Sequence, residues 1–428
     1  MLCTPELWSS YRDEPRIVSP NHKIRRRFEP HLEIVIVSVF LIGWSLAGGL
    51  AAVPEDPKPL ADLEREADQV LSEPDNVARR ARIAPVFRLA ERYDSLGQTN
   101  KAMSYYTKAL EHEPWNLSAQ LAMARLLYDA GQTNSARQKA QLAWDHAETD
   151  DLLMKAAKLL GKPFAAQLPS DPWPAGSTGM ALVPLGKVDA WLLLELRAEL
   201  PKFLGIPVVI QQRPLEIPKP GRDPVHLMAE DLRERIAKAR KEAEFQALLH
   251  KVNMAKNSLS DDEDVFAVTM AVLGAGTDKD QARRFRDELA FLRRLGPQWD
   301  ANELVARMER TFAPQPGSGR GFLGVTPMDL YANESRYVFG MAGMGRNCGV
   351  ISYRRYVGAA SDEPPNRERL KQRALKQALS STGLMFGLPR CTDPTCARAY
   401  VNSLAEHDAK QVMLCPQCKQ AFTKYFGN

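Results

Sequence analysis

Four of the six cysteines lie close to the end of the chain, and their spacing limits how this region can fold. Cys391 and Cys396 form one close pair, and Cys415 and Cys418 form a second pair. Two such pairs can close a tetrahedron of thiolates around one ion, which is the usual form of a structural zinc site. The spacing therefore predicts one structural zinc, held by all four cysteines.

Two other outcomes stay open for these cysteines. Outside the cytoplasm, neighbouring thiols are often oxidised, so the four cysteines could instead form two disulfides. Cys415 and Cys418 could also act as a thiol redox pair. The C-x2-C spacing favours zinc over disulfides. Elsewhere, Cys348 lies in an apolar run and is expected to be a buried, small hydrophobic residue.

The same region resembles the end of the archaemetzincins, a family of zinc metallopeptidases. The family pattern is HExxHxxGxxHC, followed by C-x4-C, a methionine turn and a final CxxC. Gly383, Gly387 and Cys391 keep the frame of this pattern. Segments at residues 182–186, 321–331, 337–342 and 348–355 resemble further strands of the family. The resemblance implies an α/β metzincin-like domain over residues 178–428.

The resemblance also implies that the catalytic residues are missing. In this register, the three metal-binding histidines would fall at Ser380, Leu384 and Arg390, and the catalytic glutamate at Ser381. A catalytic zinc needs three such ligands and a base for its bound water. No HExxH motif stands anywhere in the sequence. We therefore expect no catalytic site, and an arginine at position 390 would repel a divalent cation.

Three further expectations concern the surroundings of these positions. Arg398 stands where the family has its methionine turn. His407 lies between the cysteine pairs and is expected to be a surface residue rather than a substitute ligand. A helix is expected at residues 366–384, with an apolar stripe on one face. Its basic residues are expected to cover the remaining faces: Arg367, Arg369, Lys371, Arg373 and Lys376.

A repeated pattern precedes this region. The segment at residues 96–102 recurs at residues 130–136, and the offset of 34 residues is the period of the tetratricopeptide repeat. Residues 60–162 are therefore expected to form an all-α repeat array, with a partial unit near residues 60–80 and a capping helix at residues 150–160. Such arrays offer a groove to a peptide or protein partner, although a short array can also simply pack on a neighbouring domain.

Two segments between these regions have distinct compositions. Residues 165–178 contain three prolines and are expected to form a linker. Residues 222–314 show a mostly helical, charged and amphipathic pattern. We expect them to form a helical insertion in the α/β domain.

The N-terminal part contains an apolar run, Ile34–Val53, that follows three consecutive arginines. This length of apolar helix can span a bilayer, and the arginines would stay on the cytoplasmic side. The run is expected to be a cleaved signal peptide or a retained membrane anchor. Either reading places the bulk of the chain outside the cytoplasm. Residues 1–33 are expected to be a disordered tail.

The net charge of +5, from 57 basic and 52 acidic residues, is too small and too dispersed to indicate a nucleic-acid partner. The expected architecture is an α+β multidomain protein. An all-α tetratricopeptide-type array precedes an α/β metzincin-like domain with a C-terminal zinc-cysteine knuckle. We expect a non-catalytic relative of the peptidases that binds a polypeptide or protein partner through the repeat groove or the former substrate cleft. An active zinc metallopeptidase with an unusual ligand set is the alternative.

Overall fold

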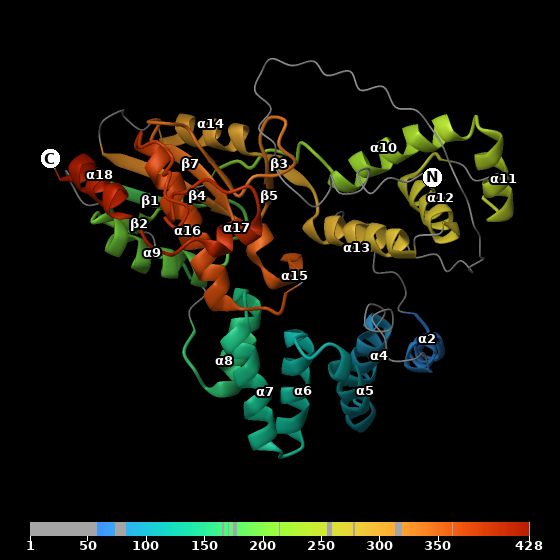
Figure 1. The fold of residues 1–428 in the computed structure, drawn as a ribbon. Coiled ribbons are helices and arrows are strands. Elements are labelled where there is room, and N and C mark those ends of the chain that lie inside the picture. Colours follow the sequence, from blue (N-terminus) through green and yellow to red (C-terminus); the bar gives the residue numbers. More distant parts are fainter. Residues whose placement is uncertain are drawn as a thin grey trace.

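The computed structural model describes residues 58–72, 83–164, 167–169, 171–173, 178–213, 215–254, 259–276, 279–312, 319–361 and 363–427. The predicted tail at residues 1–33 and the apolar run at residues 34–53 lie outside these ranges. Within these ranges, no helix has both the length and the apolar character that a bilayer span requires. Figure 1 shows a helical array, an α/β domain and a separate group of helices beside it.

The helical array runs from residue 60 to residue 160 (Figure 1). Its helices are α2 (Leu60–Ser72), α4 (Ala84–Ser95), α5 (Thr99–His112), α6 (Leu117–Asp129), α7 (Thr133–His146) and α8 (Asp150–Leu160). Gly97 and Gly131 follow α4 and α6 with φ of 69° and 77°, a left-handed turn that glycine adopts without strain. Ala102 and Ala136 are fully buried, so the helices of each pair pack closely. The predicted all-α array is therefore confirmed.

The α/β domain is built on a five-stranded sheet with the order β2-β1-β4-β7-β6. Its strands are β1 (Gly179–Pro184), β2 (Val208–Ile210), β4 (Arg320–Thr326), β6 (Gly340–Ala342) and β7 (Cys348–Ser352). All neighbours are parallel except β6, which is the antiparallel edge strand. The predicted α/β architecture is confirmed, and Cys348 is fully buried in β7 as expected.

Helices cover both faces of this sheet (Figure 1). Helices α9 (Ala190–Leu204) and α16 (Arg367–Met385) share one core with alternate strand residues such as Leu182 and Leu323. Helix α14 (Ala301–Phe312) packs on the opposite face. The C-terminal segment, with α17 (Leu404–Ala409) and α18 (Pro416–Phe426), lies on the α16 side. The short helices η1 (Arg354–Tyr356) and α15 (Gly358–Ser361) connect β7 to α16.

The helical insertion is shorter than expected. Four helices form a core of their own: α10 (Pro224–Ala239), α11 (Ala243–Lys251), α12 (Asp262–Ala275) and α13 (Lys279–Leu295). After them, β3 (Gln298–Asp300) pairs with β5 (Asp329–Tyr331), and α14 buries Leu304 and Met308 against the sheet. The segment after residue 296 therefore belongs to the α/β domain. The sequence could not reveal this, because the amphipathic pattern of α14 does not show which surface its apolar face meets.

The expected linker is not a free connection. In its described part, the Asp171 carboxylate pairs with Arg197 at 2.8 Å and accepts a hydrogen bond from the Ile210 N–H at 3.1 Å. The Trp173 ring lies 5.7 Å from the ring of Phe322. These contacts hold the segment against the β2 side of the sheet.

Carboxylates of the repeat array cap helices of the α/β domain, and these contacts anchor the array to that domain. The Asp150 carboxylate accepts hydrogen bonds from the first N–H groups of α9, at Ala190 (2.5 Å) and Trp191 (3.1 Å). The Glu148 carboxylate accepts from the N–H groups of Gly358 (2.9 Å) and Asn366 (3.0 Å). Burial raises the pKa of Glu148 despite these bonds. The last repeat therefore packs on its neighbour, which was one of the two expected roles of the array.

Candidate metal centre

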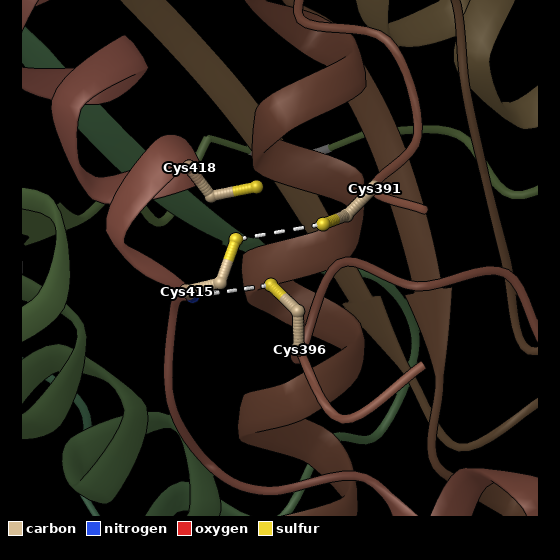
Figure 2. Close-up of side chains that lie close together, drawn as sticks. All are labelled: Cys391, Cys396, Cys415 and Cys418. Carbon is tan, nitrogen blue, oxygen red and sulfur yellow. Dashed lines mark hydrogen bonds between the residues drawn. The ribbon is translucent and has the colours of Figure 1, made fainter. Parts of the chain in front are cut away.

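The four cysteine thiols of the C-terminal segment meet in one cluster (Figure 2). Their Sγ atoms all lie within 4.8 Å of one another. The sulfurs of Cys391 and Cys415 lie 3.6 Å apart. A disulfide needs about 2.05 Å, and all four cysteines are free thiols. The structure thus brings together all four predicted ligands.

This cluster has the dimensions of a structural zinc site. Four Zn–S bonds of about 2.3 Å in a tetrahedron place neighbouring sulfurs about 3.8 Å apart. Cys396 and Cys418 are 2% and 5% exposed, and the other two cysteines are half-buried. The cluster can therefore hold one metal ion with four sulfur ligands and no open position for a substrate or water.

The start of α18 prepares one pair of ligands. Cys415 is the residue just before the helix, and Pro416 occupies its first position. A helix N-terminus favours a negatively charged group. Burial opposes ionisation, but the backbone N–H of Cys418 and the neighbouring thiols hold the pKa of Cys415 below its ordinary value. Its backbone N–H in turn lies 3.4 Å from the Cys396 sulfur, to which it donates.

Arg398 borders this cluster from the side of α16. Its side chain is buried, with the residue only 3% exposed. The guanidinium donates to the Cys418 sulfur at 3.3 Å and to the carbonyl oxygens of Leu388 (2.8 Å) and Pro389 (2.6 Å). The sequence marked Arg398 only as a departure from the methionine turn. A charged residue at a position that the family keeps apolar was the signal that could have drawn attention to it.

The positions expected to have lost the catalytic ligands differ in burial. Ser380 and Ser381 are buried in α16, and Leu384 is half-buried near its end. Arg390 is exposed, with its guanidinium 4.7 Å from the Tyr400 ring centre. Arg390 is therefore not buried with the α16 positions.

The space beside α16 is taken by Arg398 instead. A Cβ atom added at Gly383 would overlap the Arg398 guanidinium, so the glycine leaves room for this side chain. Gly383 lies between the buried serines and Leu384 on α16. A cation thus packs against the helix segment to which the expected register assigns the metal ligands.

His407 is buried, which corrects the expectation of a surface residue. It is fully inaccessible, and its ring lies 5.1 Å from that of Tyr356 and 5.5 Å from that of Phe339. Its Nε2 lies 2.9 Å from the carbonyl oxygen of Arg373. Burial lowers the pKa of His407 to about 3, so the ring is neutral at neutral pH. It lies outside the cysteine cluster, which across the described ranges is the one group of three or more potential metal ligands.

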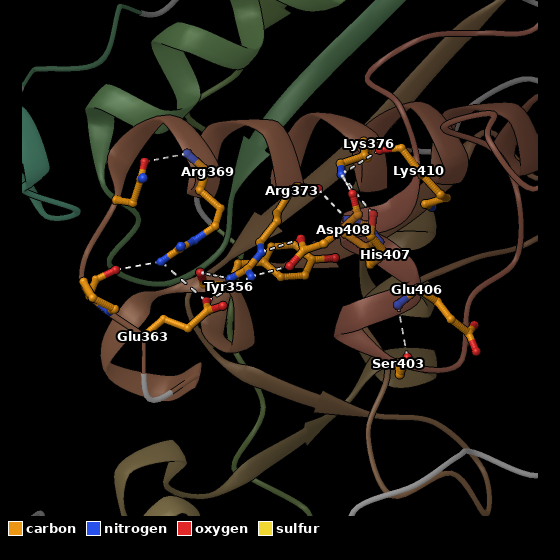
Figure 3. Close-up of polar contacts among 12 residues, drawn as sticks. Tyr356, Glu363, Arg369, Arg373, Lys376, Ser403, Glu406, His407, Asp408 and Lys410 are labelled. Atoms are coloured by element: carbon orange, nitrogen blue, oxygen red, sulfur yellow. Dashed lines mark hydrogen bonds and ion pairs between the residues drawn. The ribbon is translucent and has the colours of Figure 1, made fainter.

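Two basic residues of α16 are buried as well, against expectation (Figure 3). The Arg373 guanidinium pairs with Asp408 at 2.5 Å and with Glu363 at 3.0 Å. The Lys376 ammonium donates to the carbonyl oxygens of His407, Asp408 and Lys410, at 2.9, 3.2 and 3.0 Å. The segment with α17 folds over this face of α16, so side chains that look solvated in the helix alone become its anchors.

Comparison with known proteins places these features in a family. A tetratricopeptide repeat model matches residues 95–159, and a model of peptidase family M54 matches residues 318–424. The archaemetzincin of Pyrococcus furiosus is 37% identical over 105 residues, which are 24% of this chain and 55% of that protein. The archaemetzincin of Haloarcula marismortui is 30% identical over 126 residues, which are 29% of this chain and 70% of that protein.

Among solved structures, that of archaemetzincin from Archaeoglobus fulgidus, complexed with malonate, is 19% identical, with a TM-score of 0.33. The alignment covers 56% of this chain and 98% of that one. The chain spans little more than half the length of the Pyrococcus relatives. Archaemetzincins are zinc-dependent, and the cysteine cluster can hold such an ion. On the matched C-terminal region, this chain belongs to the archaemetzincin family, peptidase family M54, a family of zinc metallopeptidases.

Proposed function

We propose that this chain is a non-catalytic archaemetzincin that binds a polypeptide partner and keeps one structural zinc in its cysteine cluster. The observation that carries the proposal is the state of α16. The positions that hold the metal-binding histidines and the glutamate in the family are expected to fall on Ser380, Ser381, Leu384 and Arg390, and none of these is a histidine or a carboxylate. The Arg398 guanidinium packs on Gly383, so a cation lies where a catalytic metal would need anionic or neutral ligands.

The edge strand β6 supports the polypeptide-binding part of the proposal. In its ladder with β7, the Ser352 N–H donates to the Phe339 carbonyl, so residues 339 and 341 point their hydrogen-bonding groups towards β7. Gly340 and Ala342 then direct theirs away from it. An extended peptide can add to such an edge through main-chain hydrogen bonds, which need no metal.

The repeat array contributes a second candidate surface. A cavity of about 690 Å³ opens where the array meets the α/β domain. Trp115 and Leu152 line it from the array, and Tyr353 and Val357 line it from the α/β domain. A partner that used the β6 edge and this cavity would contact the repeat array and the α/β domain together, because the capping carboxylates hold the two domains in place.

Cleavage assays test the absence of catalysis. Purified full-length protein, supplied with zinc, should not cleave a peptide library above background. Loss of the ligands and the base removes both the activated water and its proton acceptor. Cleavage that is inhibited by a chelator and persists through repurification would show instead an active peptidase with an unusual ligand set.

A matched pair of edge-strand variants tests binding. Ala342→Pro removes one outward-facing N–H from β6, and proline is tolerated on edge strands. Ala342→Ser keeps that N–H and serves as the control. On arrays of unfolded or extended peptides, we expect binding by the protein and by Ala342→Ser, and weakened binding by Ala342→Pro. Equal binding by the two variants would exclude the β6 edge and leave the junction cavity as the surface to test.

We further propose that the chain acts outside the cytoplasm, either exported or anchored in a membrane. The support is the apolar run Ile34–Val53 and the arginines before it. A reporter that is active only outside the cytoplasm, fused after residue 60, should be active. An inactive, soluble cytoplasmic fusion would contradict export.

A further inference from the structure

Two buried cations border the cysteine cluster. Arg398 is 3% exposed and Lys410 is 4% exposed. In the described part of the chain, their hydrogen bonds go to carbonyl oxygens and to a sulfur, and neither pairs with a carboxylate. A buried charge without a counter-ion is strongly unfavourable. Their negative partner therefore has to come from a group other than the carboxylates.

The thiolates of a loaded cluster provide that negative charge. Four thiolates around one Zn²⁺ carry a net charge of −2, which two neighbouring cations neutralise. Two disulfides would carry no charge and would leave both cations uncompensated. The arrangement of Arg398 and Lys410 therefore favours the metal-bound form of the cluster over the oxidised form.

The two cations act on the same stretch of backbone. The Lys410 ammonium donates to the carbonyl oxygens of Ala397 (3.0 Å) and Ala399 (3.3 Å), the two neighbours of Arg398. Lys410 thus fixes the backbone from which the Arg398 side chain extends. The planar guanidinium then reaches the Cys418 sulfur on one side and the Leu388 and Pro389 carbonyls on the other.

We propose that Arg398 is a positioning residue for the structural zinc. It stabilises the Cys418 thiolate by donating a hydrogen bond to its sulfur, and it ties the loop after α16 to the cluster. This inference rests on the zinc occupancy that is part of the proposed function. In this chain, one cation beside α16 thereby supports the metal centre that the cysteines retain.

Zinc binding in three variants tests the proposal. Arg398→Met removes the charge and the sulfur hydrogen bond but keeps an apolar side chain of similar length. Arg398→Lys keeps the charge and loses the planar fork. Arg390→Met is the matched control, because Arg390 is exposed and lies over Tyr400 rather than on a sulfur. Zinc affinity and release are measured on the full chain by competition with a chromophoric chelator.

Arg398→Met should bind zinc about 10- to 100-fold more weakly, which is the usual effect of losing a residue that supports a metal ligand. Arg398→Lys should recover part of that loss, and Arg390→Met should match the unmodified protein. In cobalt-substituted protein, the sulfur-to-cobalt absorption band should move to longer wavelength in Arg398→Met, since a thiolate without its hydrogen bond gives up electron density more readily.

Unchanged zinc release and an unchanged cobalt band in Arg398→Met would overturn the proposal. Weaker binding by Arg398→Met and Arg398→Lys alike, with an unchanged cobalt band, would also overturn it and assign the side chain a packing role. If Arg398→Met proves insoluble, Arg398→Lys decides: its cobalt band must shift. A lack of zinc in the unmodified protein would instead contradict the proposed function, so the two failures are distinguishable.

Discussion

The cysteine cluster and the α16 positions lie in the same domain but differ in what holds them together. Helix α16 spans 19 residues and buries most of them against the sheet and the helices around it, so packing alone can stabilise it without a metal. The cysteine segment has only α17 and α18, of 6 and 11 residues, around long loops. The difference teaches that a helix stabilised by packing can tolerate the proposed loss of metal ligands, whereas a loop-rich segment is expected to depend on the cross-link that a bound ion would provide.

The largest effect is expected from breaking the cluster. Cys415→Ser should lose the metal and expose the C-terminal segment to proteases, because structural zinc sites supply on the order of several kcal/mol or more of folding energy. Metal content and limited proteolysis measure both consequences. Cys348→Ala is the control, since this buried thiol lies in β7 and outside the cluster. Full metal retention in Cys415→Ser, or a Cys415–Cys418 disulfide in the unmodified protein, would contradict the zinc site.

A gain of metal would sharpen the comparison from the other side. The quadruple change Ser380→His, Ser381→Glu, Leu384→His and Arg390→His restores the family ligands on and after α16. We expect it to bind a second zinc only when Arg398→Met is added, because the guanidinium beside Gly383 opposes a divalent cation. Metal content at saturating zinc should rise from one ion per chain to two. If the variant with all five substitutions binds no second ion, the alignment of these positions with the family motif is wrong.

The pH dependence of stability should reveal the buried histidine. Burial lowers the pKa of His407 to about 3, with a contribution from Lys410, whereas the unfolded value is 6.5. Between these values the unfolded chain takes up a proton that the folded chain excludes, so the free energy of unfolding falls as pH decreases from 6.5 to 3. The full loss is on the order of 5 kcal/mol.

A matched pair of variants separates the histidine from the cysteine thiolates of a zinc-loaded cluster, which also take up protons in acid. His407→Gln keeps a hydrogen-bond donor and should show a shallower decline than the unmodified protein in urea unfolding at several pH values. His250→Gln, on an exposed residue of α11, serves as the control. The same slope in all three proteins would contradict the burial of His407.

A smaller effect is expected from the anchor between α16 and α17. Arg373→Met removes a guanidinium whose side chain is 1% exposed and leaves its partners Asp408 and Glu363, which are 37% and 35% exposed. Because water solvates these carboxylates, we expect a loss of about 2–3 kcal/mol. Arg369→Met, at a more exposed position of α16, should cost under about 1 kcal/mol. Equal unfolding midpoints for the two variants would argue against the anchor.

Local patterns in the sequence were sufficient for most of the elements and for the grouping of the four cysteines. The 34-residue period reports a packing unit that recurs along the chain, so the array and its last helix, Asp150–Leu160, could be predicted. The cysteine pairs are close in sequence within each pair, and two pairs suffice to complete a tetrahedron. The expected helix at residues 366–384 differs from α16 by one residue at each end, and at the N-terminal end the reason is that Asn366 caps the helix with its side chain.

Contacts between distant segments were decided only by the tertiary structure. Arg373 and Lys376 carry charges that a helical pattern assigns to solvent, yet residues 407–410, at the end of α17 and just after it, bring a carboxylate and three carbonyl oxygens to them. The rings of Phe339 and Tyr356 cover His407, and Gly383 and Cys418 lie against the Arg398 side chain. The physical reason is that burial of a polar side chain depends on whether a partner compensates it. That partner is a property of the folded chain, while spacing and apolar periodicity are already present in the sequence.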